Sequence, residues 1–275
     1  MKPKIAIQGI QGSNHHQVAR EYFGDATDLV ECMSFDALVG QLLNKSADMG
    51  VMAIENSIAG SIIPNYALVN HNDLHIIGEH YLNIDHNLMV LKGQRIADIE
   101  EVRSHPMALL QCKEFFRDHP KIKLVEDVDT AETAKRIQQQ GFRNVAAIAP
   151  EVAAALYGLD IVARQIQTIK NNATRFIIVS TKNKALPKEE IDKASVRFVT
   201  DHKRGSLATV LNVMSDCNLN LTKIQSLPII ETPWKYAFFV DVTFEEYEHF
   251  DKAKALLGIM SEDFKVLGEY KNARL

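Results

Sequence analysis

Short apolar runs alternate with helical periods over the first part of the chain. Lys4 to Ile7 and Gly50 to Ile54 are rich in β-forming side chains, and helical periods follow them at Asn14 to Phe23 and Ile62 to Val69. Strands that alternate with helices in this way are typical of an α/β fold. We therefore predict that residues 1–180 form an α/β region.

Two longer extended runs interrupt this alternation. Leu74 to Asn83 and His86 to Leu91 show no helical period, and we expect them to cross between two lobes. The alternation resumes after them, with helices predicted to begin at Pro106, Thr130 and Pro150. Proline suits the first helical turn, and the aspartate before Thr130 is a favourable cap. Gly141 and Gly158 fit the left-handed positions just past helix ends.

A charged segment separates this region from a second pattern. Seven of the thirteen residues from Thr181 to Lys193 are charged and one is proline, so the segment is predicted to be a linker. The βαββαβ order that follows predicts a ferredoxin-like layer of helices on one antiparallel sheet. Its expected elements cover residues 195–200, 206–216, 218–230, 236–243, 247–260 and 264–267.

The composition narrows the classes of partner. The 275 residues carry 31 basic and 35 acidic side chains, a net charge of −4, so no bulk positive field attracts nucleic acid or an anionic membrane. No apolar run reaches the roughly 18 residues of a membrane helix, and the N-terminal residues show no apolar signal core. Cys32, Cys112 and Cys217 are too scattered for a disulfide framework or a metal site. We expect a reduced, cytoplasmic protein with no nucleic-acid, membrane or metal partner.

Polar residues lie at the ends of the predicted strands, most of them just after a strand, where open α/β sheets bind their ligands, and those at 171–175 just before one. Most are hydroxyls and amides, together with one arginine, a set that suits carboxylate oxygens and small hydroxyls. The residues alone therefore predict a two-lobed α/β binder of a small anion with an appended βαββαβ module. The set consists of Gly9, Gly12, Ser13, Glu55, Asn56, Ser57, Ser104, His105, Asn171, Asn172, Thr174 and Arg175.

Several of the candidate residues also have a purely structural interpretation. The segment GIQGSNHH resembles a glycine loop whose exposed backbone N–H groups meet an anion at a helix start. In the structural interpretation, Ser13 only caps that helix. Arg175 would pair with Glu55, whose pKa is raised if the carboxyl group is poorly solvated and unpaired. Gln111, seven residues beyond Ser104, would face either the ligand or solvent. The patterns leave these alternatives open.

Ten short motifs occur in a recognisable order: GIQGS, AIENSIAGSI, DHNLMV, SHPMALLQC, DTAETA, AAIAPEVAAALYGL, NNATRF, RGSLATVL, IQSLPI and WKYAFFVDV. The ordered set resembles the monofunctional prephenate dehydratases, in which a catalytic domain precedes an ACT regulatory domain. The resemblance implies a two-lobed catalytic domain like a type II periplasmic binding protein, with the active site in the cleft. The implied boundaries are a catalytic domain at 1–180 (lobe 1 at 1–80 and 166–180, lobe 2 at 81–165), a linker at 181–193 and an ACT domain at 194–275.

The resemblance also implies a reaction, the decarboxylating dehydration of prephenate to phenylpyruvate in L-phenylalanine biosynthesis, with no cofactor. Thr174 of the Thr-Arg-Phe motif would assist the leaving hydroxyl as a positioned hydrogen-bond donor, and Glu55 would be the ultimate proton source. An arogenate dehydratase and a non-catalytic amino-acid sensor remain alternatives. The other implied substrate-binding residues are Ser13, Asn56, Ser57, Ser104, Gln111, Arg175 and Phe176.

The second domain departs from the family's effector motifs. The family's Gly-Ala-Leu is Gly205, Ser206 and Leu207 here, and its Glu-Ser-Arg-Pro is Gln225, Ser226, Leu227 and Pro228. The resemblance implies that these residues bind L-phenylalanine where two copies meet, so we expect a homodimer or homotetramer under feedback regulation. Because the acid and the arginine are missing, that regulation would be weakened or changed in specificity.

Overall fold

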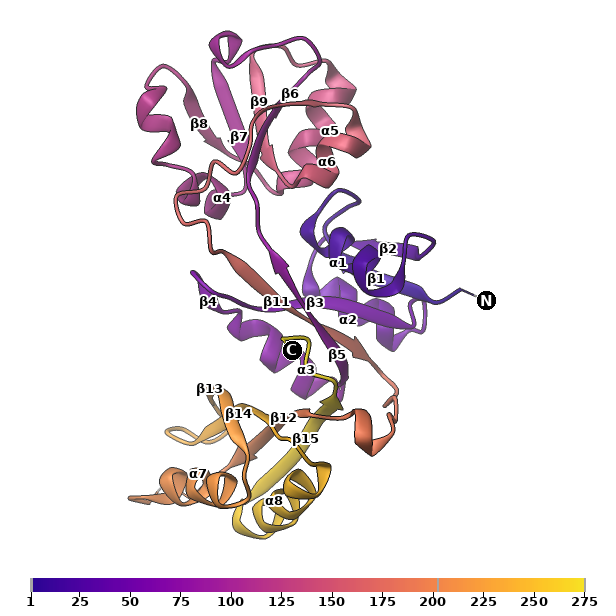
Figure 1. Ribbon diagram of the computed structural model, residues 1–275, viewed down its shortest axis with the longest axis vertical. Coiled ribbons are helices and arrows are strands. Elements are labelled where there is room, and N and C mark those ends of the chain that lie inside the picture. Colours follow the sequence, from indigo (N-terminus) through magenta and orange to yellow (C-terminus); the bar gives the residue numbers. More distant parts are fainter. Residues whose placement is uncertain (1, 202, 275) are drawn as a thin grey trace. The chain divides into compact units, whose positions relative to one another are not determined.

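The computed structural model describes residues 2–201 and 203–274, which form three sheets with helices packed on them (Figure 1). By their contacts these residues divide into two compact units. One unit runs to Gly60 and continues over Leu82–Phe176, and the other consists of Ser61–Tyr81 and the residues from Ile177 onward. The α/β class predicted for the first part of the chain is confirmed.

The first sheet has the strand order β2-β1-β3-β11-β5, with β4 paired to β3. Strand β1 runs parallel to both β2 and β3, as strand-helix-strand connections require. Its strands are β1 (Lys4–Gln8), β2 (Asp28–Cys32), β3 (Met49–Asn56), β4 (Gly60–Ser61), β5 (His75–Asn83) and β11 (Ala173–Ser180), and the helices along this part of the chain are α1 (Asn14–Phe23), α2 (Phe35–Leu43) and α3 (Ile63–His71).

The second sheet has the order β10-β6-β9-β7-β8, of which Figure 1 labels β6, β9, β7 and β8. Two apolar cores pack against it. Leu88 of β6 and Ile148 of β9 pack in one core with helix α4, whereas the neighbouring Met89 and Ala149 pack in the other with α5 and α6. Successive strand side chains point to opposite faces, so both faces of this sheet are covered. The elements are β6 (Asn87–Val90), β7 (Glu101–Ser104), α4 (Pro106–Gln111), β8 (Lys123–Glu126), α5 (Thr130–Gln140), β9 (Val145–Ala149), α6 (Glu151–Tyr157) and β10 (Asp160–Ala163).

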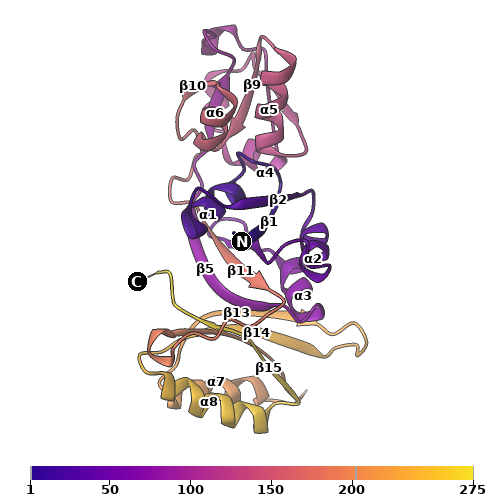
Figure 2. The same cartoon turned by 90° about the vertical axis from the view of Figure 1, so that its right-hand side faces the viewer.

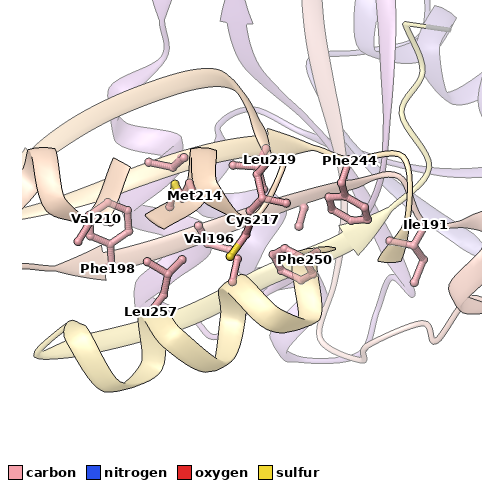
Figure 3. Packing of buried hydrophobic residues seen from close by; sticks show 14 residues of the cluster. Ile191, Val196, Phe198, Val210, Met214, Cys217, Leu219, Phe244, Phe250 and Leu257 are labelled. Atoms are coloured by element: carbon pink, nitrogen blue, oxygen red, sulfur yellow. The ribbon is translucent and has the colours of Figure 1, made fainter. Parts of the chain in front are cut away.

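The C-terminal sheet confirms the predicted βαββαβ order. Its strands are antiparallel in the order β13-β14-β12-β15, and both helices lie on one face (Figure 2). Phe198, Phe244, Phe250 and Leu257 are among the buried side chains between sheet and helices (Figure 3). The elements are β12 (Lys193–Val199), α7 (Ser206–Asp216), β13 (Asn220–Pro228), β14 (Tyr236–Thr243), α8 (Tyr247–Met260) and β15 (Asp263–Tyr270). Short 3-10 turns occur at Ile96–Asp98, Phe115–Asp118 and Lys188–Glu190.

The last strand is longer than predicted. The apolar run suggested residues 264–267, but β15 continues to Tyr270 because residues 268–270 pair with the start of β12. The Tyr270 side chain is fully buried, and its hydroxyl lies 2.6 Å from Ser195 Oγ. The ladder and this buried polar contact extend the strand past its apolar segment.

The predicted helix ends are confirmed at several positions. Ser13 accepts a hydrogen bond from His16 N, and Asp129 accepts from two N–H groups of α5, so both are N-caps. Gly141 and Gly158 end α5 and α6 in the left-handed conformation, each with φ of 64°. Pro150 is the N-cap of α6 rather than a residue of its first turn.

Residues 61–81 group with the C-terminal part of the chain rather than with the predicted first lobe. The rings of Tyr66 and Phe239 lie 5.4 Å apart, and Gly268 lies against β5. A Cβ at position 268 would fall 2.1 Å from Ile76 O, a backbone atom, so no larger residue fits there without moving β5 or β15. The expected division of the chain into lobes, linker and ACT domain stays a prediction.

No helix of residues 2–201 and 203–274 combines the length and the apolar character needed to cross a membrane.

Candidate active site

Asn56 and Thr174 meet at the ends of neighbouring strands. The Asn56 side chain closes a turn, because its Oδ1 accepts from Ile58 N at 3.0 Å and from Ala59 N at 2.9 Å. These two backbone donors fix which end of the amide is oxygen. Asn56 Nδ2 therefore faces Thr174 Oγ1 as a donor, at 2.9 Å. The Thr174 hydroxyl keeps its own proton for another acceptor.

The amide of Asn56 begins a longer hydrogen-bonded chain. Its Nδ2 also donates to Asn172 Oδ1 at 2.7 Å, and Asn172 Nδ2 donates to Gln111 Oε1 at 3.0 Å. His86 Nε2 lies 2.8 Å from the same Gln111 oxygen, so it acts there as a donor. In the described residues, no partner holds the Gln111 Nε2 group, which is therefore available to a ligand.

This series of hydrogen-bonded side chains is largely shielded from water. Asn172, His86 and Thr174 are all buried. Burial lowers the pKa of His86, against the opposing effects of its hydrogen bond to Gln111 and of the charge on Asp85. The ring is accordingly neutral near pH 7, with its proton on Nε2. His86 Nδ1 is buried and finds no partner in the part of the chain that the structure describes.

Ser57 joins the two strands that carry the candidate site. Its N–H donates to Ala173 O at 2.8 Å, and its Oγ accepts from Ala173 N at 3.0 Å. Both bonds fix the backbone immediately before Thr174. Arg175 follows on β11 and is buried, whereas Glu55, next to Asn56 on β3, is half-buried.

The glycine loop does not present the backbone N–H groups that its sequence suggested. Gly9 N donates to Cys32 O, Gln11 N to Glu31 Oε1, Gly12 N to His16 Nδ1 and Ser13 N to Ile10 O. Each of these four donors already has an acceptor within the protein. A contact between this loop and an anion would therefore depend on the Ser13 side chain, which also caps α1.

Close packing against α6 explains the second glycine of this loop. Gly12 has φ of +96°, and a Cβ there would lie 3.1 Å from Tyr157 Cε2 and 3.3 Å from Ala153 Cα. The Tyr157 hydroxyl donates to Gln11 O at 2.5 Å. The loop thus serves as a contact to the second sheet's helices.

Two predicted substrate contacts are buried inside the protein. Ser104 is fully buried and donates from Oγ to Ile148 O at 2.7 Å, which ties β7 to β9. Phe176 is buried with its ring edge-on to His15, at 5.0 Å between centroids. In this conformation both side chains support the site, and their contact with substrate stays a prediction.

The site thus brings together Asn56, Ser57, Gln111 and Thr174 of the predicted residues. It also contains Asn172, which the sequence analysis placed among the polar candidates but not among the substrate-binding residues, and His86, which it did not choose at all. The available signals were the second asparagine before the Thr-Arg-Phe motif and the histidine that begins the second long extended run.

A polar pocket of about 340 Å³ opens beside the segments that join the two sheets. None of the predicted site residues is among its lining residues. They are Asn14, Gln17, Asn83, Asp85, Asn87, Pro150, Glu151, Arg164 and Gln165.

His15 is expected to make stability depend on pH. The ring lies 5.5 Å from Phe35 and 5.0 Å from Phe176, and burial lowers the pKa of His15 to about 3. In the unfolded chain the His15 ring takes up a proton near pH 6.5, whereas in the folded protein it stays neutral down to about pH 3. The stability of the fold is therefore fully present above pH 6.5. As pH falls from 6.5 toward 3, the free energy of unfolding should drop by up to about 1.4 kcal/mol per pH unit from this group.

The measurement is urea unfolding of the wild type and of His15→Phe at pH 7, 6 and 5. Other titrating groups contribute equally to both proteins, so the difference between the two slopes isolates His15. Equal slopes would show that His15 is protonated in the folded state.

Known proteins resemble this chain over nearly its full length. The sequence profile of the prephenate dehydratase family matches residues 5–184. A bifunctional chorismate mutase/prephenate dehydratase of Enterobacter agglomerans is 33% identical over 271 residues, covering 97% of this chain and 70% of that protein. Arogenate dehydratase 2 of Petunia hybrida is 34% identical over 286 residues, covering 97% of this chain and 71% of that protein.

Two solved structures share the fold. The prephenate dehydratase of Arthrobacter aurescens in complex with L-Phe is 25% identical, with a TM-score of 0.87 over 98% of this chain and 90% of that chain. A protein described as a novel type of quorum-quenching acylase is 26% identical, with a TM-score of 0.87 over 98% of each chain. The profile covers well over half of the sequence, and the relatives exceed 30% identity over most of their own length. The chain belongs to the prephenate dehydratase family.

Proposed function

We propose that this protein converts prephenate to phenylpyruvate, a step in the synthesis of phenylalanine. The reaction takes the prephenate dianion and one proton to phenylpyruvate, carbon dioxide and water. The ring carbon–carboxylate bond breaks, its electron pair completes the aromatic ring, and the ring hydroxyl leaves as water. The observation that supports this function best is the Thr174 hydroxyl, which accepts from Asn56 Nδ2 and so has its own proton to donate.

Thr174 assists the cleavage of the bond between the ring carbon and its hydroxyl oxygen. Its O–H donates to the departing oxygen as negative charge develops there, and the bond from Asn56 polarises that O–H. A threonine hydroxyl is too weak an acid to give up its proton permanently near pH 7. We assign the replacement proton to Glu55, beside Asn56 at the end of β3.

The two substrate carboxylates and the keto oxygen need hydrogen-bond donors. The Nε2 group of Gln111 and the guanidinium of Arg175 supply them, with the hydroxyls of Ser13 and Ser57 as further donors. Each charge-assisted bond contributes roughly 1.5–3 kcal/mol to binding. We assign Asn56, Ser104 and Phe176 to the same substrate site.

The test is direct. Purified protein is mixed with prephenate, and the ultraviolet absorbance of phenylpyruvate is read in alkali. Product that forms in proportion to enzyme concentration supports the proposal. The absence of product at micromolar protein, with prephenate still bound, would instead identify a non-catalytic sensor.

Arogenate is the second candidate substrate, because a relative at 34% identity is named an arogenate dehydratase. Arogenate carries an amino group where prephenate carries the keto oxygen. The ratio of kcat/KM for the two substrates decides between them. Acyl transfer is less well supported: a nucleophilic hydroxyl needs an adjacent base, and the Asn56 amide on Thr174 Oγ1 cannot accept a proton.

L-phenylalanine is expected to inhibit the enzyme through the C-terminal domain, across two paired copies. The relative of known structure from Arthrobacter aurescens binds L-Phe. Here Gly205 is the N-cap that precedes α7, with φ of 87°, and Gln225 to Pro228 end β13. With Gln225 and Leu227 in place of an acid and an arginine, we expect weak inhibition. The double variant Gln225→Glu, Leu227→Arg should lower the inhibitory concentration about tenfold.

Activity and the thermal midpoint are titrated with phenylalanine up to millimolar concentration, with native protein as the control for the double variant. If phenylalanine changes neither quantity in either protein, this regulation does not exist in the chain. Sedimentation at the same phenylalanine concentrations measures the oligomeric state.

A further inference from the structure

We propose that Asn172 and His86 are positioning residues, which hold the Gln111 carboxamide with its oxygen turned inward and its nitrogen turned toward the substrate. The inference rests on the proposed function, because it concerns a residue that would bind prephenate. It adds two buried side chains to the working parts of the site and gives each a defined task.

Two backbone donors determine the direction of each hydrogen bond in the series that links Asn56, Asn172, Gln111 and His86. Ile58 N and Ala59 N both donate to Asn56 Oδ1, so the nitrogen of that amide must face Asn172. Asn172 therefore accepts on Oδ1 and donates from Nδ2 to Gln111 Oε1. Each amide orients the next, and neither Asn56 nor Asn172 can turn over without losing hydrogen bonds at both its oxygen and its nitrogen.

His86 supplies the second donor to Gln111. Its backbone is held on both sides, since His86 N donates to Gln167 Oε1 at 3.0 Å and Ile166 N donates to His86 O at 2.8 Å. The ring is thereby directed at Gln111 Oε1, 2.8 Å from Nε2. This orientation leaves His86 Nδ1 as a buried acceptor with no hydrogen-bond partner in the described residues, which is unfavourable. The hydrogen bond from His86 Nε2 to Gln111 Oε1 explains why the ring keeps this orientation although Nδ1 has no partner.

Two donors on one oxygen fix the free end of Gln111. If the carboxamide rotated by half a turn, its NH₂ group would face the Asn172 Nδ2 donor, and His86 would have to carry its proton on Nδ1, which is buried and has no acceptor in the described residues. The inward position therefore accepts only oxygen, and Nε2 is left to donate outward. Gln111 presents a donor to a carboxylate or keto oxygen of the substrate before that substrate arrives.

A matched pair of variants tests the assignment in the full-length protein. His86→Gln places an amide donor near the position of the imidazole Nε2, whereas His86→Leu fills similar space with no donor. We expect His86→Leu to lower kcat/KM for prephenate by about 10 to 100-fold, and His86→Gln to recover most of that loss. The thermal midpoints of His86→Leu and His86→Gln should be similar, so that the lower kcat/KM of His86→Leu does not come from unfolding.

A double-mutant cycle separates positioning from a structural role. If His86 acts through Gln111, then adding His86→Leu to Gln111→Leu causes no further loss of kcat/KM. Losses that multiply, or a His86→Gln variant as impaired as His86→Leu, would overturn the proposal. Should His86→Leu fail to fold, Asn172→Ala in the same cycle with Gln111→Leu gives the same decision. A wild type that forms no phenylpyruvate would contradict the proposed function instead.

Discussion

Replacing Thr174 by alanine is expected to lower kcat/KM for prephenate by about 10² to 10⁴-fold, the range for a well-placed proton donor. The alanine variant removes the hydroxyl that accepts from Asn56 Nδ2 and that would donate to the departing oxygen. Asn56 keeps its bonds to Asn172 and to the turn at Ile58, so the fold should be unaffected. Steady-state rates of phenylpyruvate formation measure the loss, and circular dichroism checks the fold.

Two further substitutions at Thr174 isolate the hydroxyl from the shape of the side chain. Thr174→Val keeps the β-branched form in the strand and should be as impaired as the alanine variant. Thr174→Ser keeps the hydroxyl and should recover a large part of the activity. A valine variant with near-normal turnover would remove Thr174 from the mechanism.

Replacing Lys193 by methionine is expected to lower the free energy of unfolding by about 3–5 kcal/mol. Lys193 Nζ lies 2.9 Å from both carboxylate oxygens of Glu79, and both side chains are buried. Glu79 also accepts from Ala273 N at 3.1 Å. Methionine has a similar length but no charge, so it leaves a buried carboxylate opposite an apolar group. Urea unfolding at pH 7 measures the change.

The companion variants show whether the effect belongs to the pair. Glu79→Leu combined with Lys193→Met removes both charges and should be clearly more stable than Lys193→Met alone. Lys265→Met serves as the exposed control, because its partner Asp73 is open to solvent and the pair should contribute little. If the double variant is no more stable than the single one, the ion pair is not the source of the loss.

Local signals in the sequence were sufficient for much of the fold. Helix α1 runs from Asn14 to Phe23 as predicted, because Ser13 caps its start and Gly24 ends it. The C-terminal elements followed from short-range alternation and from turns. Strand β2 and helix α2, at Asp28 to Leu43, were not among the predicted elements, since Asp28, Glu31 and Asp36 interrupt their apolar pattern.

The candidate site could be predicted only in part. Strand ends identified Asn56 and Thr174, which hydrogen bond across 118 positions of sequence. The link from Gln111 to His86 spans 25 positions and depends on how two segments pack, which no local pattern encodes. In the glycine loop, by contrast, the sequence suggested a feature that the structure does not have. Its composition suggested free N–H groups, but Glu31 accepts from Gln11 N across 20 positions.

The contact between Gly268 and β5 also bears on how other sequences are interpreted. A side chain of any size at position 268 would meet the backbone oxygen of Ile76. A relative that carries glycine here can seat its C-terminal strand as this protein does, whereas one with a larger residue must hold that strand elsewhere. The residue at this one position near the end of the chain therefore indicates whether a relative can share this packing.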